Sequence, residues 1–124
     1  MNKTWEVCSD ITYAISERGS MAEYKRILDN RAVKVWLFSG DWDDVVPFTD
    51  TELNVEKMRR TKVGEWNSWN VGDQHAGFYQ LYANNFTVIT VKGASHMVPQ
   101  STPKPMYQLF YNFVNNKGVN NQVF

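Results

Sequence analysis

Two polar turns carry the residues of this chain best suited to acid–base chemistry. Asp41 and Asp43 follow an apolar stretch, residues 33–38, and His96 follows a second apolar stretch, residues 86–91. A neutral imidazole can accept a proton from a hydroxyl nucleophile and return it to a leaving group, while a carboxylate holds its tautomer and stabilises the imidazolium. Because the carboxyl ends of parallel strands meet at one edge of a sheet, we expect a carboxylate and His96 to lie together there.

The order of these residues along the chain is that of the last two members of a Ser–Asp–His triad in α/β-hydrolases. The Gly-x-Ser-x-Gly elbow that should precede them does not occur in the 124 residues. Ser95 follows Gly93 and Ala94, but the next glycine is absent and a side chain beside His96 normally diverges from the ring. We therefore expect the nucleophilic serine in a portion that precedes these residues, and not at Ser95.

The predicted elements alternate between helix and strand, which is typical of the α/β class. Helices are expected over residues 10–18, 21–30, 49–60 and 103–116, and strands over residues 33–38, 77–82 and 86–91. Ser20 and Glu23 predict a capping box at the start of the second helix. Residues 83–85 predict a hairpin turn, and the polar tail from Asn115 is expected to fray.

The stretch at residues 33–38 is nearly continuously apolar, which favours a strand covered on both faces in the middle of a sheet. Only about three strands are predicted in the chain, so this strand would expose its edge and its faces to water. We therefore expect one α/β unit that is incomplete on its own, with a missing portion supplying the rest of the sheet.

The composition disfavours several classes of partner. Thirteen basic and thirteen acidic residues balance, so no general field favours nucleic acid or an anionic membrane. No apolar stretch approaches membrane-spanning length, and 43% hydrophobic with 15% aromatic residues argue against disorder. The two histidines and the single cysteine are too dispersed to predict a metal site, and His75 is expected to be solvated in a polar loop.

Cys8 and two glycosylation sequons favour the secretory route. A single cysteine is mostly an inert buried thiol in a cytosolic chain, whereas in a secreted chain it suggests a bond to another chain. The tripeptides Asn2-Lys3-Thr4 and Asn85-Phe86-Thr87 make Asn2 and Asn85 candidate glycosylation sites.

Longer motifs resemble those of the serine carboxypeptidase family. Residues 39–47 match its Ser-Gly-Asp-x-Asp-x-Val-Val-Pro pattern, and residues 93–99 match Gly-Ala-Gly-His-Met-Val-Pro except for Ser95 in place of the second glycine. Its Trp-x-x-Cys-Ser element resembles residues 5–9, and its Trp-x-x-Trp and aromatic-flanked glycine resemble residues 66–78. The resemblance implies that residues 1–124 are the C-terminal segment of an α/β-hydrolase domain, with a central, mostly parallel sheet flanked by helices.

The resemblance also implies a role for each matched residue. Asp43 would be the triad acid and Asp41 would hold the turn, with Asp41 as the acid kept as an alternative. His96 would be the general base and then the general acid. Met97 would line the substrate pocket beside the scissile bond, or else fill the core. Cys8 would form a disulfide with the N-terminal portion, which in two-chain members is the larger chain.

By resemblance, the whole enzyme would remove C-terminal residues from peptides through an acyl-enzyme, in a lysosome, a vacuole or the extracellular space. It would need no metal or organic cofactor, and this chain alone is expected to be inactive. Acyl transfer and cyanohydrin cleavage on the same scaffold remain alternatives, as does another α/β-hydrolase such as an esterase. A non-catalytic alternative is a binding module in which Trp66 and Trp69 form a flat stacking surface for a sugar or peptide, although dense aromatic residues are more often core.

Overall fold

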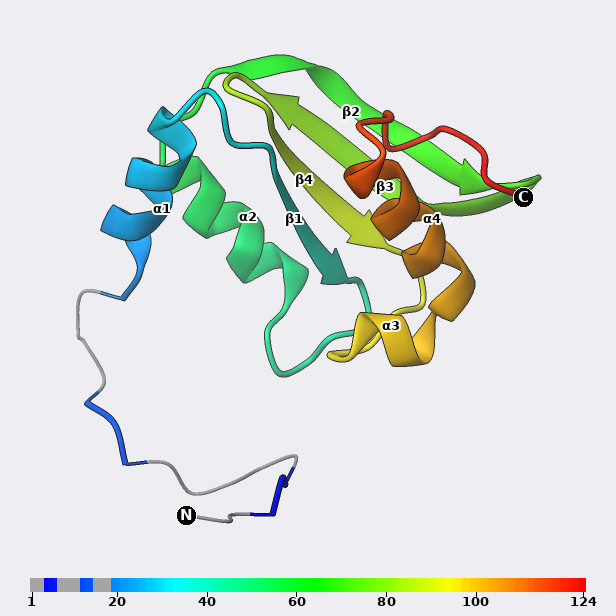
Figure 1. Cartoon of the computed structure of the whole chain (residues 1–124), viewed down its shortest axis with the longest axis horizontal. Helices are drawn as coiled ribbons and strands as arrows, with labels where there is room; N and C mark the ends of the chain where they lie inside the picture. The colour runs from blue at the N-terminus through cyan, green and yellow to red at the C-terminus, as the bar shows by residue number, and fades with distance from the viewer. Residues whose placement is uncertain (1–3, 7–11, 15–18) are drawn as a thin grey trace.

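A four-stranded mixed sheet organises the computed structural model, which describes residues 4–6, 12–14 and 19–124 (Figure 1). The strands are β1 (Val35–Gly40), β2 (Lys62–Val71), β3 (Gln74–Tyr82) and β4 (Phe86–Val91), and their order in the sheet is β1-β4-β3-β2. The helices are α1 (Met21–Asp29), α2 (Phe48–Lys57), α3 (Val98–Ser101) and α4 (Pro103–Val114). Strand β1 runs parallel to β4, whereas the β4–β3 and β3–β2 pairs are antiparallel.

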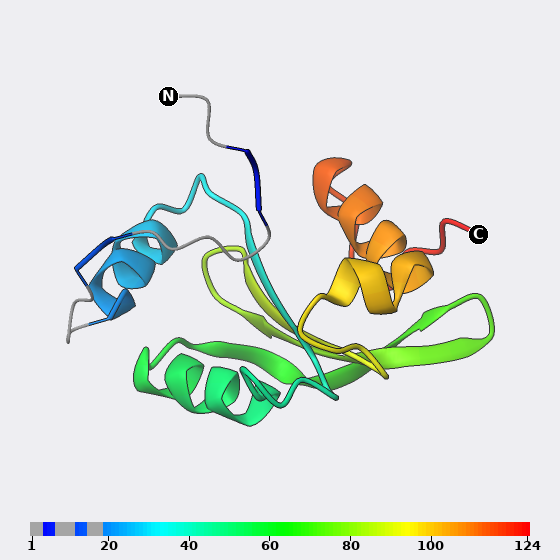
Figure 2. The ribbon, with the colours of Figure 1, turned by 90° about the horizontal axis from the view of Figure 1, so that it is seen from below.

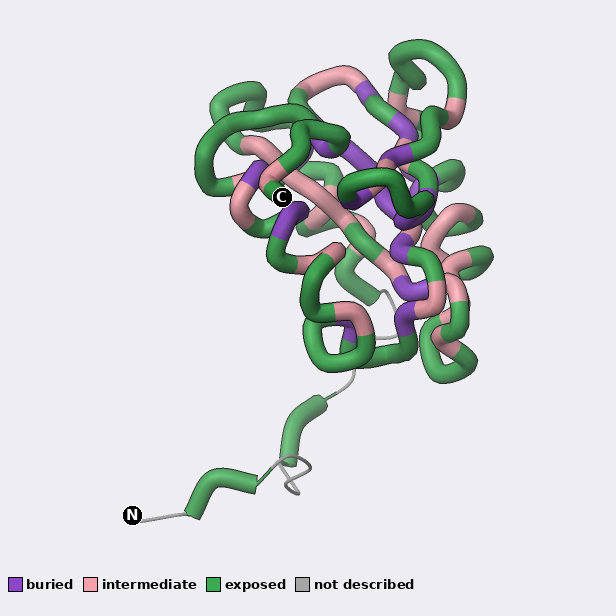
Figure 3. Tube along the Cα trace, turned by 90° about the vertical axis from the view of Figure 1, so that its right-hand side faces the viewer, coloured by how far each residue is buried: buried purple, intermediate pink, exposed green. Residues whose placement is uncertain are grey.

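Helices cover both faces of the sheet. The side chains of a strand alternate between its faces, and here apolar side chains on each face pack against helices. Figure 2 shows α2 and α4 on opposite sides of the strands. On the α4 face, Ile89 and Val91 of β4 pack in one core cluster with Leu109. On the other face, Phe86 and Val88 pack with residues of α1 and α2. In Figure 3 the buried stretches of the trace lie inside exposed turns and helix surfaces. A mixed sheet with helices on both faces is an α/β fold.

Most of the predicted elements are confirmed, with ends that differ by a few residues. The expected helices at 21–30, 49–60 and 103–116 correspond to α1, α2 and α4, and the expected strands correspond to β1, β3 and β4. The predicted hairpin turn at residues 83–85 joins β3 to β4, with Asn84 and Asn85 at φ angles of 63° and 57°. Asparagine is one of the few side chains that tolerates this left-handed conformation. The expected helix at 10–18 falls largely outside the described residues.

The strand that the sequence did not predict is β2. Its side chains are mostly exposed, so it lacks the apolar alternation that marks a strand. Register shifts between Val63 and Asn67 and between Trp69 and Asn70 also disturb the alternation. Pairing with β3 forms this strand, and its addition makes two of the three described strand pairs antiparallel. The described part of the sheet is therefore mixed, and the mostly parallel sheet expected for the whole domain stays a prediction.

Strand β1 lies at one edge of the described sheet, not in its middle. Its side chains at residues 35–37 are half-buried, and Phe38 is 39% exposed. On the side of β1 away from β4, no strand lies beside it among the described residues. An apolar strand with a free edge is a ready template for pairing with a further strand.

Two local expectations are wrong. The side chain of Ser20 makes no capping hydrogen bond to α1, and its backbone has φ −106° and ψ 16° instead of an extended conformation, so the capping box with Glu23 is absent. The C-terminal tail is packed rather than frayed, because Val119 is only 3% exposed. The buried Asn112 of α4 donates through Nδ2 to the carbonyls of Val119, at 3.2 Å, and Asn121, at 2.8 Å.

We expect Asn112→Ala to release the tail. The substitution removes two hydrogen bonds to buried or half-buried carbonyls, which should lower the free energy of opening the tail by about 1–3 kcal/mol. Hydrogen exchange of the amides of residues 118–122 would measure this opening. The control is Asn115→Ala, because the Nδ2 of Asn115 donates only to Tyr111 one turn back. Equal exchange in the two variants would contradict the prediction.

Candidate active site

Asp43 and His96 lie together where β1 and β4 end. His96 Nδ1 is 3.0 Å from Asp43 Oδ2. The Asp43 side chain is 7% exposed and the His96 side chain is 55% exposed. When the carboxylate is ionised, Nδ1 carries a proton and donates it, so the neutral imidazole has its lone pair on Nε2. No residue that the structure describes forms a hydrogen bond with Nε2, and this nitrogen is free to act as a base.

The backbone of the same turn holds the Asp43 carboxylate. Its Oδ1 accepts the N–H groups of Val45, at 2.9 Å, and Val46, at 3.0 Å. The Val46 N–H is the largest cause of the lowered pKa of Asp43, and the hydrogen bonds from His96 and Val45 act in the same direction against partial desolvation. Asp43 therefore remains a carboxylate in mildly acidic as well as neutral solution.

A second set of hydrogen bonds joins the aspartate turn to the histidine turn. Asp41 Oδ1 accepts the N–H of Gly93 at 2.6 Å, and the N–H of Trp42 donates to the carbonyl of Ala94 at 3.0 Å. Gly40 is required at the end of β1, since a Cβ there would come within 2.2 Å of the Ala94 carbonyl oxygen. These contacts fix the distance between the two turns and so the distance between Asp43 and His96.

The histidine turn is also held from its far side by α3. The N–H of Ser95 donates to Ser101 Oγ at 3.1 Å. Gly93 has a φ of 70°, whereas Ser95 is not among the residues with a positive φ. A serine therefore replaces the second glycine of the family motif without strain in the backbone.

Sequence reasoning missed the amides of Val45 and Val46 and the hydroxyl of Ser101 as supports of the site. An aspartate that accepts N–H groups two and three residues later is a known turn arrangement, so the segment from Asp43 to Val46 carried a usable signal. Nothing in the sequence indicates Ser101, because its contact with Ser95 depends on how α3 folds back.

The other candidate residues lie in different places. Met97 follows His96 and is 54% exposed, so it does not fill the core. Asn85 is exposed in the β3–β4 turn, where its Nδ2 donates to the Arg31 carbonyl at 3.0 Å. Cys8 and Asn2 lie outside the described residues, and their predicted disulfide and glycosylation stay predictions.

The aromatic stacking surface expected for a binding module is not formed. Trp69 is fully buried in the core on the α4 face, and its Nε1 donates to the Thr90 carbonyl at 3.0 Å. Trp66 is half-buried and packs against the core on the opposite face. His75 lies on β3 instead of in a loop, and it is exposed as expected.

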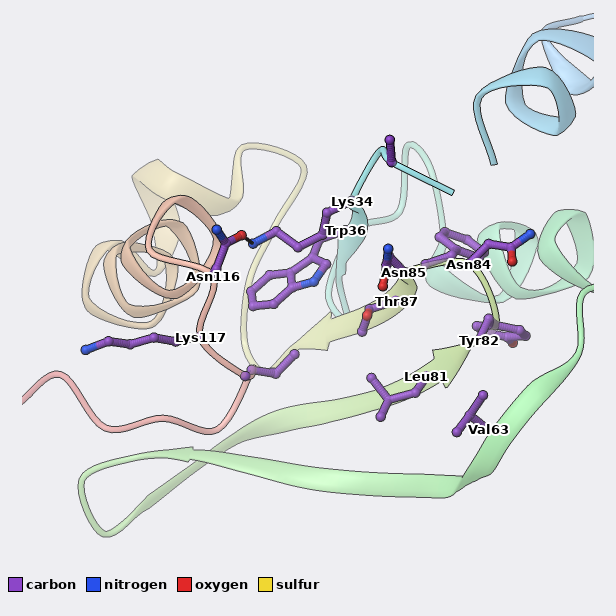
Figure 4. A pocket seen from close by; sticks show the side chains of 14 residues that line it. Lys34, Trp36, Val63, Leu81, Tyr82, Asn84, Asn85, Thr87, Asn116 and Lys117 are labelled. Carbon is purple, nitrogen blue, oxygen red and sulfur yellow. Dashed lines mark hydrogen bonds between the residues drawn. The ribbon is translucent and has the colours of Figure 1, made fainter. Parts of the chain in front are cut away.

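A cavity of about 630 Å³ lies at the opposite ends of β1 and β4 from the Asp43–His96 pair. Figure 4 shows Lys34 reaching Asn116 on one side of this cavity and Leu81 and Val63 on the other. Lys34 Nζ donates to the Phe113 carbonyl and, at 3.0 Å, to Asn116 Oδ1, and burial lowers the pKa of this lysine. Lys34 therefore binds the C-terminal end of α4, where the helix dipole favours a cation. Neither Asp43 nor His96 lines this cavity, which is separate from the candidate site.

The described residues contain no group of three or more His, Cys, Asp or Glu side chains placed to hold a metal ion. Within the same part of the chain, no helix combines the length and the apolar character needed to cross a membrane.

The mixed sheet with helices on both faces defines an α/β protein, and a carboxylate–histidine pair after two adjacent parallel strands is the arrangement of a triad hydrolase. The model of the family described as serine carboxypeptidase matches residues 1–116. The chain therefore belongs to the serine carboxypeptidase family, whose members have the α/β-hydrolase fold.

Curated relatives agree with this membership. The chain is 40% identical over 110 residues to serine carboxypeptidase-like 21 of Arabidopsis thaliana, a match that covers 89% of this chain and 22% of the relative. It is 32% identical over 117 residues to serine carboxypeptidase II-1 of Hordeum vulgare, covering 92% of this chain and 36% of the relative. The chain thus spans roughly a fifth to a third of the length of these two relatives.

The lowered pKa of Asp43 predicts a pH-dependent contribution to stability. A carboxylate with a lowered folded-state pKa stabilises fully above its unfolded value, here 3.8, and loses this contribution as the pH falls through the folded value. We expect wild type to be more stable than Asp43→Asn at neutral pH, with the difference shrinking below pH 3.8. Denaturant unfolding at several pH values would measure it. The matched control is Asp44→Asn, since Asp44 is exposed and adjacent; a difference independent of pH would contradict the prediction.

Proposed function

We propose that this chain supplies the acid–base pair of a serine carboxypeptidase that removes C-terminal residues from peptides. Asp43 is the triad acid and His96 is the general base. The observation that carries the proposal is the 3.0 Å contact between His96 Nδ1 and Asp43 Oδ2 in a chain of this family. Asp41 is the less suitable acid, because its described hydrogen bond goes to the Gly93 N–H and not to His96.

In the proposed reaction, His96 Nε2 takes the proton of a serine hydroxyl as the serine oxygen attacks the carbonyl carbon of the last peptide bond. The imidazolium forms beside the Asp43 carboxylate, which stabilises it. His96 then gives the proton to the nitrogen of the departing amino acid, and the peptide remains as an acyl-enzyme. Water, deprotonated by the same Nε2, attacks the acyl carbon, and the proton passes back to the serine oxygen.

The nucleophilic serine is proposed to lie in an N-terminal portion or larger chain that precedes these residues. Three observations support this partner: the chain has no Gly-x-Ser-x-Gly elbow, it covers a minor part of its relatives, and β1 has a free edge in the described sheet. Exposed apolar side chains lie near this edge, since Phe38 of β1 and Phe110 of α4 both line one apolar pocket. A strand from the partner portion, paired with β1, would cover them. On this proposal, the chain alone is inactive.

Met97 is proposed to line the substrate pocket, because its exposed side chain directly follows the general base. The enzyme is proposed to enter the secretory route and to act in a lysosome, a vacuole or outside the cell, with glycans at Asn2 and Asn85. The lowered pKa of Asp43 suits an acidic compartment, since the carboxylate stays ionised there. The reaction requires no metal or organic cofactor.

The test is hydrolysis of N-blocked dipeptides by the full-length protein, followed as release of the C-terminal amino acid. We expect His96→Ala to lower kcat by roughly 10³-fold or more and Asp43→Asn by a comparable factor, with smaller changes in KM. His75→Ala is the control, because His75 is exposed on β3 and forms no described hydrogen bond with Asp43 or His96. Near-normal turnover by His96→Ala would overturn the proposal, and a larger loss for Asp41→Asn than for Asp43→Asn would reassign the acid. Transfer of the acyl group to another acceptor, or cyanohydrin cleavage, in place of hydrolysis would identify one of the alternative activities.

Cys8 is expected to carry a disulfide to the N-terminal portion. Peptide mapping of the native protein without reduction should recover the Cys8 peptide joined to a peptide from outside these residues. If the two portions are separate chains, reduction should also release a species near 14.4 kDa. Alkylation of Cys8 in the unreduced, denatured protein would contradict the expectation.

A further inference from the structure

A second cavity, of about 490 Å³, lies beside the aspartate turn on the α2 face of the sheet. Its walls include four aromatic side chains and two carboxylates, namely Trp42, Phe48, Trp66, Phe78, Asp41 and Glu52. We call it the aromatic–acidic cavity. These residues come from the turn after β1, from α2 and from the β2–β3 hairpin, so the described chain builds the cavity by itself.

The two carboxylates of this cavity have no cationic partner among the described residues. The ion pairs in that part of the chain join Arg60 to Asp29 and His96 to Asp43. Asp41 uses Oδ1 for the Gly93 N–H, and no described hydrogen bond occupies its Oδ2 or the carboxylate of Glu52. Both residues are half-buried. Partly desolvated carboxylates without a counter-charge favour the binding of a cation.

The aromatic walls define what kind of cation fits. Trp42 is 77% exposed and Phe78 is 48% exposed, so their rings are accessible to a ligand. A cation held over an aromatic face is attracted by the ring quadrupole, and tryptophan is the strongest partner. A guanidinium group combines stacking on an indole with paired hydrogen bonds to a carboxylate, and its apolar stem can pack on the remaining rings.

We propose that the aromatic–acidic cavity binds the side chain of an arginyl or lysyl residue, with its head group between Asp41 and Glu52. The site differs from the Asp43–His96 pair but adjoins it, since Asp41 precedes Asp43 by two residues in the same turn. It lies on the α2 face of the sheet, whereas the apolar pocket beside β1 is lined by residues of the α4 face. The residue is supplied by a separate peptide or by a part of the same protein outside the described residues.

The experiment titrates the full-length protein with Nα-acetyl-arginine amide and, as the neutral isostere, Nα-acetyl-citrulline amide. Binding is followed by calorimetry and by tryptophan fluorescence. We expect saturable binding of the arginine compound, weakened by added salt, and little binding of the citrulline compound. Glu52→Gln and Trp66→Leu should each weaken binding by roughly three- to tenfold. Glu56→Gln is the matched control, because Glu56 is on the same helix but does not line the cavity.

A second measurement, the melting temperature, tests the case in which a cationic side chain of the protein itself already occupies the cavity. In that case the arginine compound does not bind, but Glu52→Gln lowers the melting temperature by several degrees relative to Glu56→Gln, since it removes the partner of an internal cation. Binding by a separate peptide and occupation from within both support the site. Three results would overturn it: equal binding of arginine and citrulline, equal effects of Glu52→Gln and Glu56→Gln on binding, or no binding with equal melting temperatures.

Discussion

The parallel pairing of β1 with β4 is the constraint on which the candidate site depends. Its register places Gly40 opposite Val91, so both strands end at the same level of the sheet. The turn that follows each strand then begins beside the other, although the two are far apart in sequence. Gly40 allows the backbones to approach closely because it has no Cβ to meet Ala94. Without this close approach, a side-chain contact between the two turns would not be held at one distance.

The two aspartates of the first turn have different surroundings, and this difference separates their tasks. Asp41 faces the backbone of the histidine turn and binds the Gly93 N–H, which joins the turns. Asp43 accepts two N–H groups of its own turn through Oδ1 and directs Oδ2 to His96. A carboxylate held by backbone donors keeps its orientation while a proton moves at the imidazole. The arrangement supports Asp43 as the proposed acid and Asp41 as the residue that positions it.

The two edges of the described sheet differ in a way that bears on the rest of the protein. The β2–β3 hairpin forms one edge, and the side chains of β2 are mostly polar and exposed. Strand β1 forms the other edge with a largely apolar sequence. Polar edges resist further pairing, whereas an apolar edge favours it. On these grounds the proposed N-terminal portion joins at β1.

Elements with strong local signals could be predicted from the amino-acid sequence alone. Apolar runs predicted β1 and β4, and apolar residues on one side predicted α4. A capping-box pattern predicted α1, and less regular apolar spacing predicted α2. The motifs around Asp43 and His96 indicated both the pair and the family. Local signals were enough there because these properties depend on the type and spacing of neighbouring residues. They were misleading at Ser20, where the residue types of a capping box occur without the hydrogen bond.

Features that depend on contacts between distant residues are seen only in the folded chain. Strand β2 forms because β3 pairs with it, the tail is held because Asn112 is buried beneath it, and Trp69 is core because its ring and Nε1 meet β4. The 3.0 Å contact of His96 with Asp43 likewise required the register of β1 on β4. Pairing register, burial and hydrogen-bond partners are properties of the assembled chain, and no short stretch of sequence contains them.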